Sequence, residues 1–243
     1  ESFDVRLTSR PLSNVVLNIT GLNTGEGMLS TSSLTFEPTS WNVLQPVTVT
    51  GVNDLIADGN KTYPLVIAYS SGDAAFAACT RTVDVTNLDD DAAGVTVSPS
   101  TLTTTEGGSN TFTIALNTQP TANVIIDVSS TDITEGTVSP ASLTFTSTDW
   151  AAKTITVSGV ADNEIDGNIT YNVNIAAAVS SDGNYSGKFA STVSVTNNDV
   201  DVAGLNFTTP TTGLVTTENG GTATFSFKLT SKPTSTVDVN LVS

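Results

Sequence analysis

Residues 162–168 read Asp-Asn-Glu-Ile-Asp-Gly-Asn, and residues 54–60 read Asp-Leu-Ile-Ala-Asp-Gly-Asn. The two stretches share the frame Asp-x-x-x-Asp-Gly-Asn, and after two further residues each is followed by a tyrosine, Tyr63 or Tyr171. Such self-similarity at a fixed period is typical of tandem repeats and decides how the rest of the chain is divided.

The period of the repeat predicts the domain organisation. Trp41 and Trp150 are separated by 150 − 41 = 109 residues. We therefore expect residues 1–93 to form a unit that lacks its first strand, 94–203 a complete unit, and 204–243 the opening strands of a third.

Short runs of alternating apolar and polar residues, separated by Gly, Pro, Asn and Ser, predict strands throughout the complete unit. The expected strands are 94–105 (interrupted at Pro99), 110–117, 123–130, 142–146, 153–158, 170–178 and 189–197. Strands of Val, Ile, Thr and Phe at this spacing indicate an all-β fold of tandem seven-stranded antiparallel immunoglobulin-like β-sandwiches.

The composition restricts the classes of partner. The 243 residues include 24 acidic and 8 basic side chains, which gives a net charge of −16. This charge disfavours nucleic acid and anionic membranes and favours cations. The chain has no histidine and one cysteine, Cys79, so most proton-transfer and thiol chemistry is disfavoured and we expect no enzyme. No apolar run is long enough to enter a membrane as a helix.

The acids of the complete unit gather at one end if consecutive strands alternate in direction. The loops after the first, third and fifth strands and the end of the seventh then share one pole. Eight of the eleven acids lie there: Glu106, Asp132, Glu135, Asp162, Glu164, Asp166, Asp199 and Asp201. Converging carboxylates with amide and backbone oxygens favour Ca²⁺, which prefers six to eight oxygen ligands.

We therefore predict a Ca²⁺ site in the complete unit, and a poorer one in the first unit. The candidate ligands in the complete unit are Glu106, Asp132, Asp162, Glu164, Asp166, Asp199 and Asp201; those in the first unit are Asp54, Asp58, Asp89, Asp90 and Asp91, with a Glu expected upstream. In the first unit, Ile56 stands where the second has Glu164. The alternative for each acid is a solvated loop residue, because Asp favours turns without any ion.

Several of these motifs together resemble the Calx-β repeats of sodium/calcium exchangers, integrin β4 and large bacterial surface proteins. The matching motifs are Thr105-Glu106-Gly107-Gly108, Ser142-Leu143-Thr144-Phe145, Lys153-Thr154-Ile155-Thr156-Val157, the acidic loop 162–168, and Thr192-Val193-Ser194-Val195-Thr196 leading to Asp199 and Asp201. The resemblance implies the seven-strand sandwich and Ca²⁺ binding by the acidic positions. Ala161 departs from the double Asp that is usual in that family.

These patterns favour a calcium-stiffened structural or adhesive segment of an extracellular or cell-surface repeat protein or fibre. The expected partners are neighbouring repeats of the same chain, and other copies in a fibre or a cell-surface glycan or protein. The alternative is a glycan- or protein-binding module of a surface adhesin, with the loop Ser181–Gly187 as a candidate contact. An intracellular Ca²⁺ sensor and a hydrolase built on a carboxylate pair are weaker alternatives.

Overall fold

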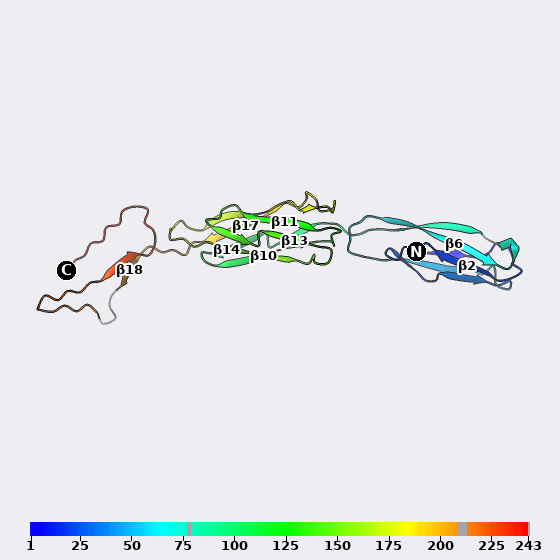
Figure 1. Cartoon of the computed structure of the whole chain (residues 1–243), viewed down its shortest axis with the longest axis horizontal. Helices are drawn as coiled ribbons and strands as arrows, with labels where there is room; N and C mark the ends of the chain where they lie inside the picture. Colours follow the sequence, from blue (N-terminus) through cyan, green and yellow to red (C-terminus); the bar gives the residue numbers. More distant parts are fainter. Residues whose placement is uncertain (77–78, 209–212, 243) are drawn as a thin grey trace. The chain divides into compact units, whose positions relative to one another are not determined.

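The computed structural model describes residues 1–76, 79–208 and 213–242. The chain divides into two compact units, Glu1–Ala92 and Ala93–Ser243, which are coloured blue to green and green to red in Figure 1. Each unit is built from β-strands, and the described residues include one short 3₁₀ turn, η1 (Ala74–Phe76).

The first unit consists of two antiparallel sheets. Its strands are β1 (Ser2–Val5), β2 (Val15–Thr20), β3 (Gly27–Leu29), β4 (Ser33–Phe36), β5 (Gln45–Gly51), β6 (Lys61–Ser71) and β7 (Thr80–Asn87). One sheet has the order β1-β5-β3, and the other has the order β4-β2-β6-β7. Alternate residues of β2, Val15, Leu17 and Ile19, are buried in the core, as the period of two along a strand requires.

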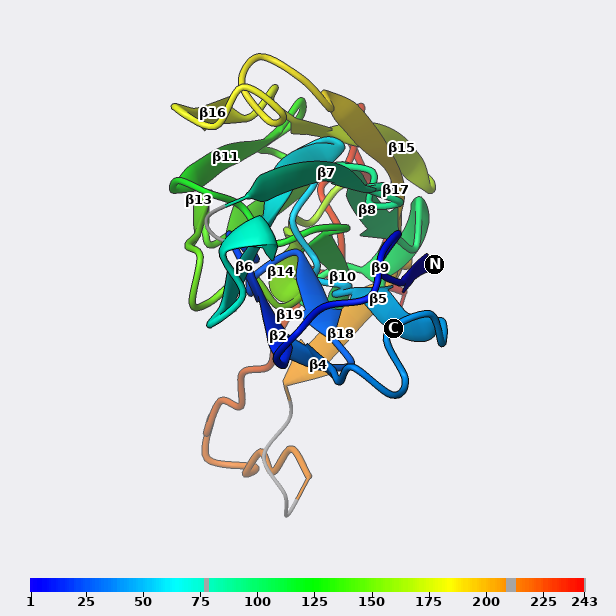
Figure 2. The same ribbon diagram turned by 90° about the vertical axis from the view of Figure 1, so that its right-hand side faces the viewer.

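The second unit contains the same two layers with more strands. They are β8 (Val95–Ser98), β9 (Thr101–Thr105), β10 (Ser109–Leu116), β11 (Val124–Ser130), β12 (Gly136–Ser139), β13 (Ser142–Phe145), β14 (Lys153–Gly159), β15 (Ile169–Ile175), β16 (Val179–Ser180) and β17 (Ser191–Asn198). One sheet is β12-β14-β10-β8, and the other is β13-β11-β15-β17-β9, with β16 beside β11. The neighbours β15 and β17 are visible side by side in Figure 2.

The core of the second unit lies between these two sheets. Phe112 and Ile155 point inward from one sheet, and Val193, Val195 and Val173 point inward from the other, all of them almost fully buried. Strands β18 (Leu205–Thr208) and β19 (Ser226–Leu229) pair with each other as a separate antiparallel ribbon.

The structure confirms the all-β fold of antiparallel sheets and adds two features to it. The first predicted strand divides at Pro99 into β8 and β9, which join different sheets, and β9 pairs with β17 in a parallel register. The short strand β12 was not expected. It begins at Gly136, where a Cβ atom would collide with the hydroxyl group of Tyr171, so only glycine fits.

Candidate metal centre

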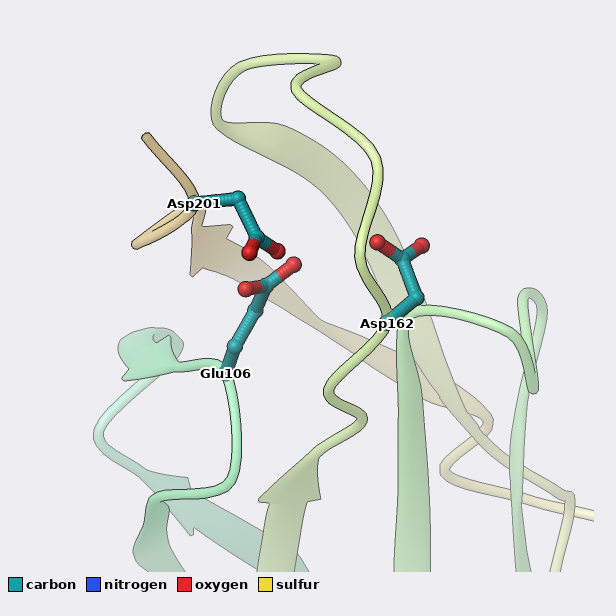
Figure 3. A group of neighbouring side chains, drawn as sticks. All are labelled: Glu106, Asp162 and Asp201. Atoms are coloured by element: carbon teal, nitrogen blue, oxygen red, sulfur yellow. The ribbon is translucent and has the colours of Figure 1, made fainter. Parts of the chain in front are cut away.

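Three carboxylates from three different strand ends meet in the second unit. Glu106 follows β9, Asp162 lies in the loop after β14, and Asp201 lies after β17. One carboxylate oxygen from each lies within 4.8 Å of the others. Figure 3 shows the side chains of Glu106 and Asp201 facing each other, with Asp162 directed toward them from the neighbouring loop. Because the parallel strand β9 runs beside β17, Glu106 is brought next to the residues that follow β17.

Backbone donors hold the loop carboxylates in place. Asp199 accepts one hydrogen bond from the amide of Gly167 (2.9 Å) and another from the amide of Asp201 (2.7 Å). In return, the amide of Asp199 donates to the side chain of Asn168 at 3.2 Å. Gly167 has φ +79°, a conformation that favours glycine, so the Asp-Gly-Asn motif has a local structural reason.

A second carboxylate group shares Asp162 with the first. Oxygens of Glu135, Asp162 and Asp166 also lie within 4.8 Å of one another. Glu135 accepts a hydrogen bond from the side-chain amide of Asn197 (3.3 Å), which also donates to the carbonyl of Val160 (3.2 Å). Asn197 is 1% exposed, so it links this loop to the buried end of β17.

The electrostatics of the first group are unfavourable without a cation. Burial, together with the nearby charges of Asp201, Asp162 and Asp199, raises the pKa of Glu106 despite a hydrogen bond from the amide of Val200. One oxygen of Asp201, Oδ2, is buried and has no hydrogen-bond partner among the described residues. A buried carboxylate oxygen without a donor is costly, and a cation in contact with it would remove that cost.

The first unit reproduces this hydrogen-bond network residue by residue. Asp89 accepts hydrogen bonds from the amides of Gly59 (2.5 Å) and Asp91 (2.9 Å), and its own amide donates to Asn60 (3.0 Å). Asn87 donates to Glu26 at 3.1 Å. The corresponding residues in the second unit are Asp199, Gly167, Asp201, Asn168, Asn197 and Glu135.

A small cavity lies inside this network in the first unit. It has a volume of about 20 Å³ and is lined by five aspartates, Asp54, Asp58, Asp89, Asp90 and Asp91, together with Glu26 and Asn87. That volume is enough for one water-sized particle. Burial and the four neighbouring aspartates raise the pKa of Asp91. All five candidate ligands of the first unit therefore surround one small, strongly negative space.

Three of the candidate ligands in the second unit have other partners. Asp199 lies outside both carboxylate groups, and each of its carboxylate oxygens accepts a hydrogen bond from a backbone amide, as described above. Asp132 accepts hydrogen bonds from the hydroxyl (2.6 Å) and the amide (3.0 Å) of Thr134, which lower the pKa of Asp132. Glu164 forms an ion pair with Lys232. Like Asp199, these two residues belong to neither of the carboxylate groups found among the described residues.

Glu135 lies at the predicted acidic pole, but neither Glu135 nor Glu26 is among the predicted ligands. The sequence contains a feature that could identify them, because the two glutamates are separated by the repeat spacing, 135 − 26 = 109. Both are half-buried, and both accept a hydrogen bond from an asparagine at the end of a strand, Asn197 in β17 or Asn87 in β7.

The ligand atoms available at these sites suit a hard cation. The two groups in the second unit and the cavity in the first are lined by carboxylate, amide and backbone oxygens, and the chain has no histidine. Oxygen-only ligands at irregular spacing fit Ca²⁺ better than zinc, which prefers nitrogen and sulfur, or Mg²⁺, which needs near-ideal octahedral geometry. In the second unit Glu106, Asp162, Asp201, Asp166 and Glu135 would hold the ion.

Comparisons with known proteins give distant likenesses. No protein-family model matches the sequence, and no curated protein matches it. Among solved structures, CBD12 from CALX1.2 is 14% identical with a TM-score of 0.39, over 81% of this chain and 92% of that chain. Domains 4 and 5 of the S-layer protein SbsC are 16% identical with a TM-score of 0.34, over 75% and 99%.

The extracellular cadherin domains 1–5 of protocadherin gamma B2 are 12% identical with a TM-score of 0.33, over 89% of this chain. This chain spans only 40% of the length of that protocadherin. At these scores the likenesses carry no argument about function, so the fold class rests on the strand pairing. In the described part of the chain, no helix has the length and apolar character needed to cross a membrane.

Proposed function

We propose that this chain is a calcium-stiffened structural or adhesive segment of an extracellular or cell-surface repeat protein. In this proposal residues 1–93, 94–203 and 204–243 are successive Calx-β-like repeats, the first without its opening strand and the last represented by its opening strands. Ca²⁺ bound at the acidic loops holds them in one conformation, and neighbouring repeats or other copies are the partners.

The single observation that carries the proposal is the duplication of the carboxylate network. Aspartates that only formed turns would need no common arrangement, yet the same Asp-Gly-Asn loop, strand-end asparagine and half-buried glutamate recur in both units with the same hydrogen bonds. The linker Asp89-Asp90-Asp91 directly precedes the next unit in the sequence. Ion binding there would restrain the chain where one repeat passes into the next.

Buried positions in the loop Ser181–Gly187 make the alternative of a glycan- or protein-binding module less favourable. Tyr185 is 1% exposed and hydrogen-bonds through its hydroxyl to Thr118 (2.8 Å). Asp182 is 5% exposed and accepts a hydrogen bond from the amide of Thr121 (2.9 Å). The aromatic and acidic side chains that would contact a glycan are therefore occupied inside the unit.

Thermal unfolding of the 243-residue chain with EDTA and with Ca²⁺ tests the proposal. For a dissociation constant of order 0.1 mM and about 10 mM Ca²⁺, linkage predicts roughly 2.7 kcal/mol of stabilisation for each unit that binds an ion. Mg²⁺ at the same concentration is expected to stabilise less. Identical melting curves in EDTA and Ca²⁺ would leave the carboxylates as solvated loops.

A matched pair of variants assigns the effect to the candidate site. Asp162→Asn keeps the oxygen that accepts the hydrogen bond from the amide of Glu164 but removes the charge shared by both carboxylate groups. Asp127→Asn makes the same change at an exposed position in β11. By titration calorimetry, the first is expected to weaken Ca²⁺ binding more than tenfold and the second to leave it unchanged. Equal losses in both would contradict the assignment.

A further inference from the structure

One buried hydroxyl group at the acidic end of the second unit has no hydrogen-bond partner. Tyr171 lies in β15 and is 5% exposed, yet its hydroxyl group forms no hydrogen bond with any of the described residues. The hydroxyl group of Thr104 is nearby, but it lies outside hydrogen-bonding geometry and donates to the side chain of Asn197 at 3.0 Å. A buried hydroxyl group without a partner is costly, so its position requires a reason.

The hydroxyl group of Tyr171 lies against the backbone beside Glu135. A Cβ atom on Gly136, the next residue, would be only 1.7 Å from the hydroxyl oxygen. Burial raises the pKa of Tyr171, the nearby Thr104 hydroxyl group opposes this in part, and the charges of Glu135 and Asp132 raise it further. Glycine at position 136 therefore leaves room for the hydroxyl group to approach these two carboxylates.

Of these two carboxylates, Glu135 has the weaker existing contacts. Asp132 already accepts two hydrogen bonds from Thr134, at 2.6 and 3.0 Å. The carboxylate of Glu135 accepts a longer hydrogen bond, 3.3 Å, from the side chain of Asn197. Glu135 is therefore the better acceptor for a hydrogen bond from Tyr171.

Glu135 is also one of three carboxylates that could hold a single cation. One of its oxygens lies within 4.8 Å of oxygens of Asp162 and Asp166. Carboxylates that bind a metal ion are usually hydrogen-bonded themselves, and these outer contacts fix the direction of the ligand oxygens. A hydrogen bond from a neutral phenol would orient Glu135 without adding a charge to the site.

The first unit repeats this packing. Tyr63 is 6% exposed, and a Cβ atom on Gly27 would be 2.0 Å from its hydroxyl oxygen. Burial and the charge of Glu26 raise the pKa of Tyr63. In both units the glycine directly follows the glutamate in the sequence, so tyrosine, glycine and glutamate recur as one set together with the carboxylate network.

We propose that Tyr171 is a positioning residue for the cation site: when an ion binds, its hydroxyl group donates a hydrogen bond to Glu135 and directs that carboxylate toward the ion shared with Asp162 and Asp166. Tyr63 has the same role toward Glu26. This inference rests on the proposed Ca²⁺ function and adds to it an uncharged residue of the core. Because the ring of Tyr171 is part of the hydrophobic core, the hydrogen bond connects the loops to the packed interior of the unit.

A background chain confines the measurements to the second unit. Asp54→Asn and Asp91→Asn remove two charges from the cavity of the first unit. Trp41→Phe leaves the fluorescence of Trp150, which packs against the core of the second unit. Each variant is compared with this 243-residue background chain by titration calorimetry with Ca²⁺ and by thermal unfolding in EDTA.

Tyr171→Phe removes the hydroxyl group and keeps the ring. In EDTA the variant loses a group that has no partner, so it is expected to melt at the temperature of the background chain or above it. Its Ca²⁺ affinity is expected to fall about 10- to 100-fold, as for the loss of other outer contacts to metal ligands. A hydroxyl group satisfied by a buried water would give the opposite pattern, a lower melting temperature in EDTA with unchanged affinity, and would overturn the proposal.

Tyr185→Phe is the matched control, because Tyr185 is equally buried but its hydroxyl group has partners. Tyr185 is 1% exposed, and its hydroxyl group donates to the carbonyl of Thr118 at 2.8 Å. The control is expected to melt lower in EDTA, since it loses a satisfied hydrogen bond, and to change Ca²⁺ affinity less than about threefold. Equal losses of affinity in the two variants would mean that any change in the core weakens binding, and the positioning role would be contradicted.

A double-mutant cycle tests whether Tyr171 acts through Glu135. Glu135→Ala removes the side chain that Tyr171 is proposed to orient. In that background, adding Tyr171→Phe is expected to change Ca²⁺ affinity less than about threefold, because the two residues act as one unit. An effect of Tyr171→Phe that persists in full without Glu135 would overturn the proposed contact.

The same measurements separate this inference from the proposed function. If the wild-type chain binds no Ca²⁺ and melts identically in EDTA and Ca²⁺, the proposed function fails and the inference fails with it. If the background chain binds Ca²⁺ and Tyr171→Phe binds it with equal affinity, the proposed function stands and the positioning role of Tyr171 is overturned. Weaker binding by Tyr171→Phe, with no loss of stability in EDTA and no further effect in the Glu135→Ala background, is the result that supports both.

Discussion

The two units build the same loop network and differ in the strand that closes it. In both, the glycine amide of an Asp-Gly-Asn loop donates a hydrogen bond to an aspartate, and an asparagine near the end of a strand donates to a glutamate. Only the second unit, among the described residues, adds a strand beside the last one and a glutamate at its end, Glu106. The loops therefore set the positions of the aspartates, and the covering strand sets how completely they are enclosed.

The largest difference in stability between the two units is expected when the asparagine common to both networks is replaced. Asn197→Leu removes a side chain that is 1% exposed and leaves the hydroxyl of Thr104 and the carbonyl of Val160 without their partner. Unsatisfied buried groups cost about 1 to 3 kcal/mol each, so we expect a loss of about 2 to 4 kcal/mol. Asn87→Leu is expected to cost less because water reaches the half-buried Asn87.

Urea unfolding followed by tryptophan fluorescence measures this difference unit by unit. Trp41 reports on the first unit and Trp150 on the second, since each packs against the core of its own unit. Replacing one tryptophan with phenylalanine leaves a signal from the other. If Asn87→Leu destabilised its unit as much as Asn197→Leu, the covering role of β9 would be contradicted.

A second and smaller effect on stability comes from the charge of Glu106, which follows β9. The raised pKa of Glu106 means that the folded state binds its proton more tightly than the unfolded state does. Its contribution to stability is therefore present below the unfolded pKa and is lost as pH rises through the folded pKa. At neutral pH without Ca²⁺, the ionised Glu106 destabilises the second unit.

The effect of Glu106→Gln on the melting temperature is consequently expected to change sign when Ca²⁺ is added. In EDTA at pH 7 the variant melts a few degrees higher than the wild type, and with Ca²⁺ it melts lower because a ligand has been removed. The gain in EDTA disappears as the pH is lowered through the range where Glu106 protonates. Melting curves at pH 7 and pH 4 test this, and a variant that is less stable under every condition would contradict it.

Much of the fold could be predicted because alternation in single strands is a local property. The predicted strand at 153–158 is observed as Lys153–Gly159, and that at 110–117 as Ser109–Leu116. The parallel pairing of β9 could not be predicted in this way, since it depends on where the chain turns at Pro99. The glycine at position 136 is likewise explained only by its contact with Tyr171, which is distant in sequence.

The candidate site was predictable to the level of which loops meet, but not to the level of which oxygens are free. Strand alternation placed Glu106, Asp162 and Asp201 at one pole, and the structure brings them together. It also placed Asp132 there, whose oxygen accepts from Thr134 two residues away. A local hydrogen bond of this kind competes with a ligand role and is invisible in a count of acids.

The smallest effect, a change in Ca²⁺ affinity, is expected where the two acidic loops differ in sequence, at Glu164 and Ile56. Glu164 belongs to neither carboxylate group of the described residues, and its carboxylate pairs with Lys232 on an exposed surface. Exposed ion pairs contribute little, so Glu164→Ile is expected to change Ca²⁺ affinity less than threefold by titration calorimetry. The reciprocal change, Ile56→Glu, is expected to be equally weak in the first unit. A loss as large as that of Asp162→Asn would mean that Glu164 leaves Lys232 to bind the ion, and the difference between the two loops would then lie in ligand number as well as in the covering strand.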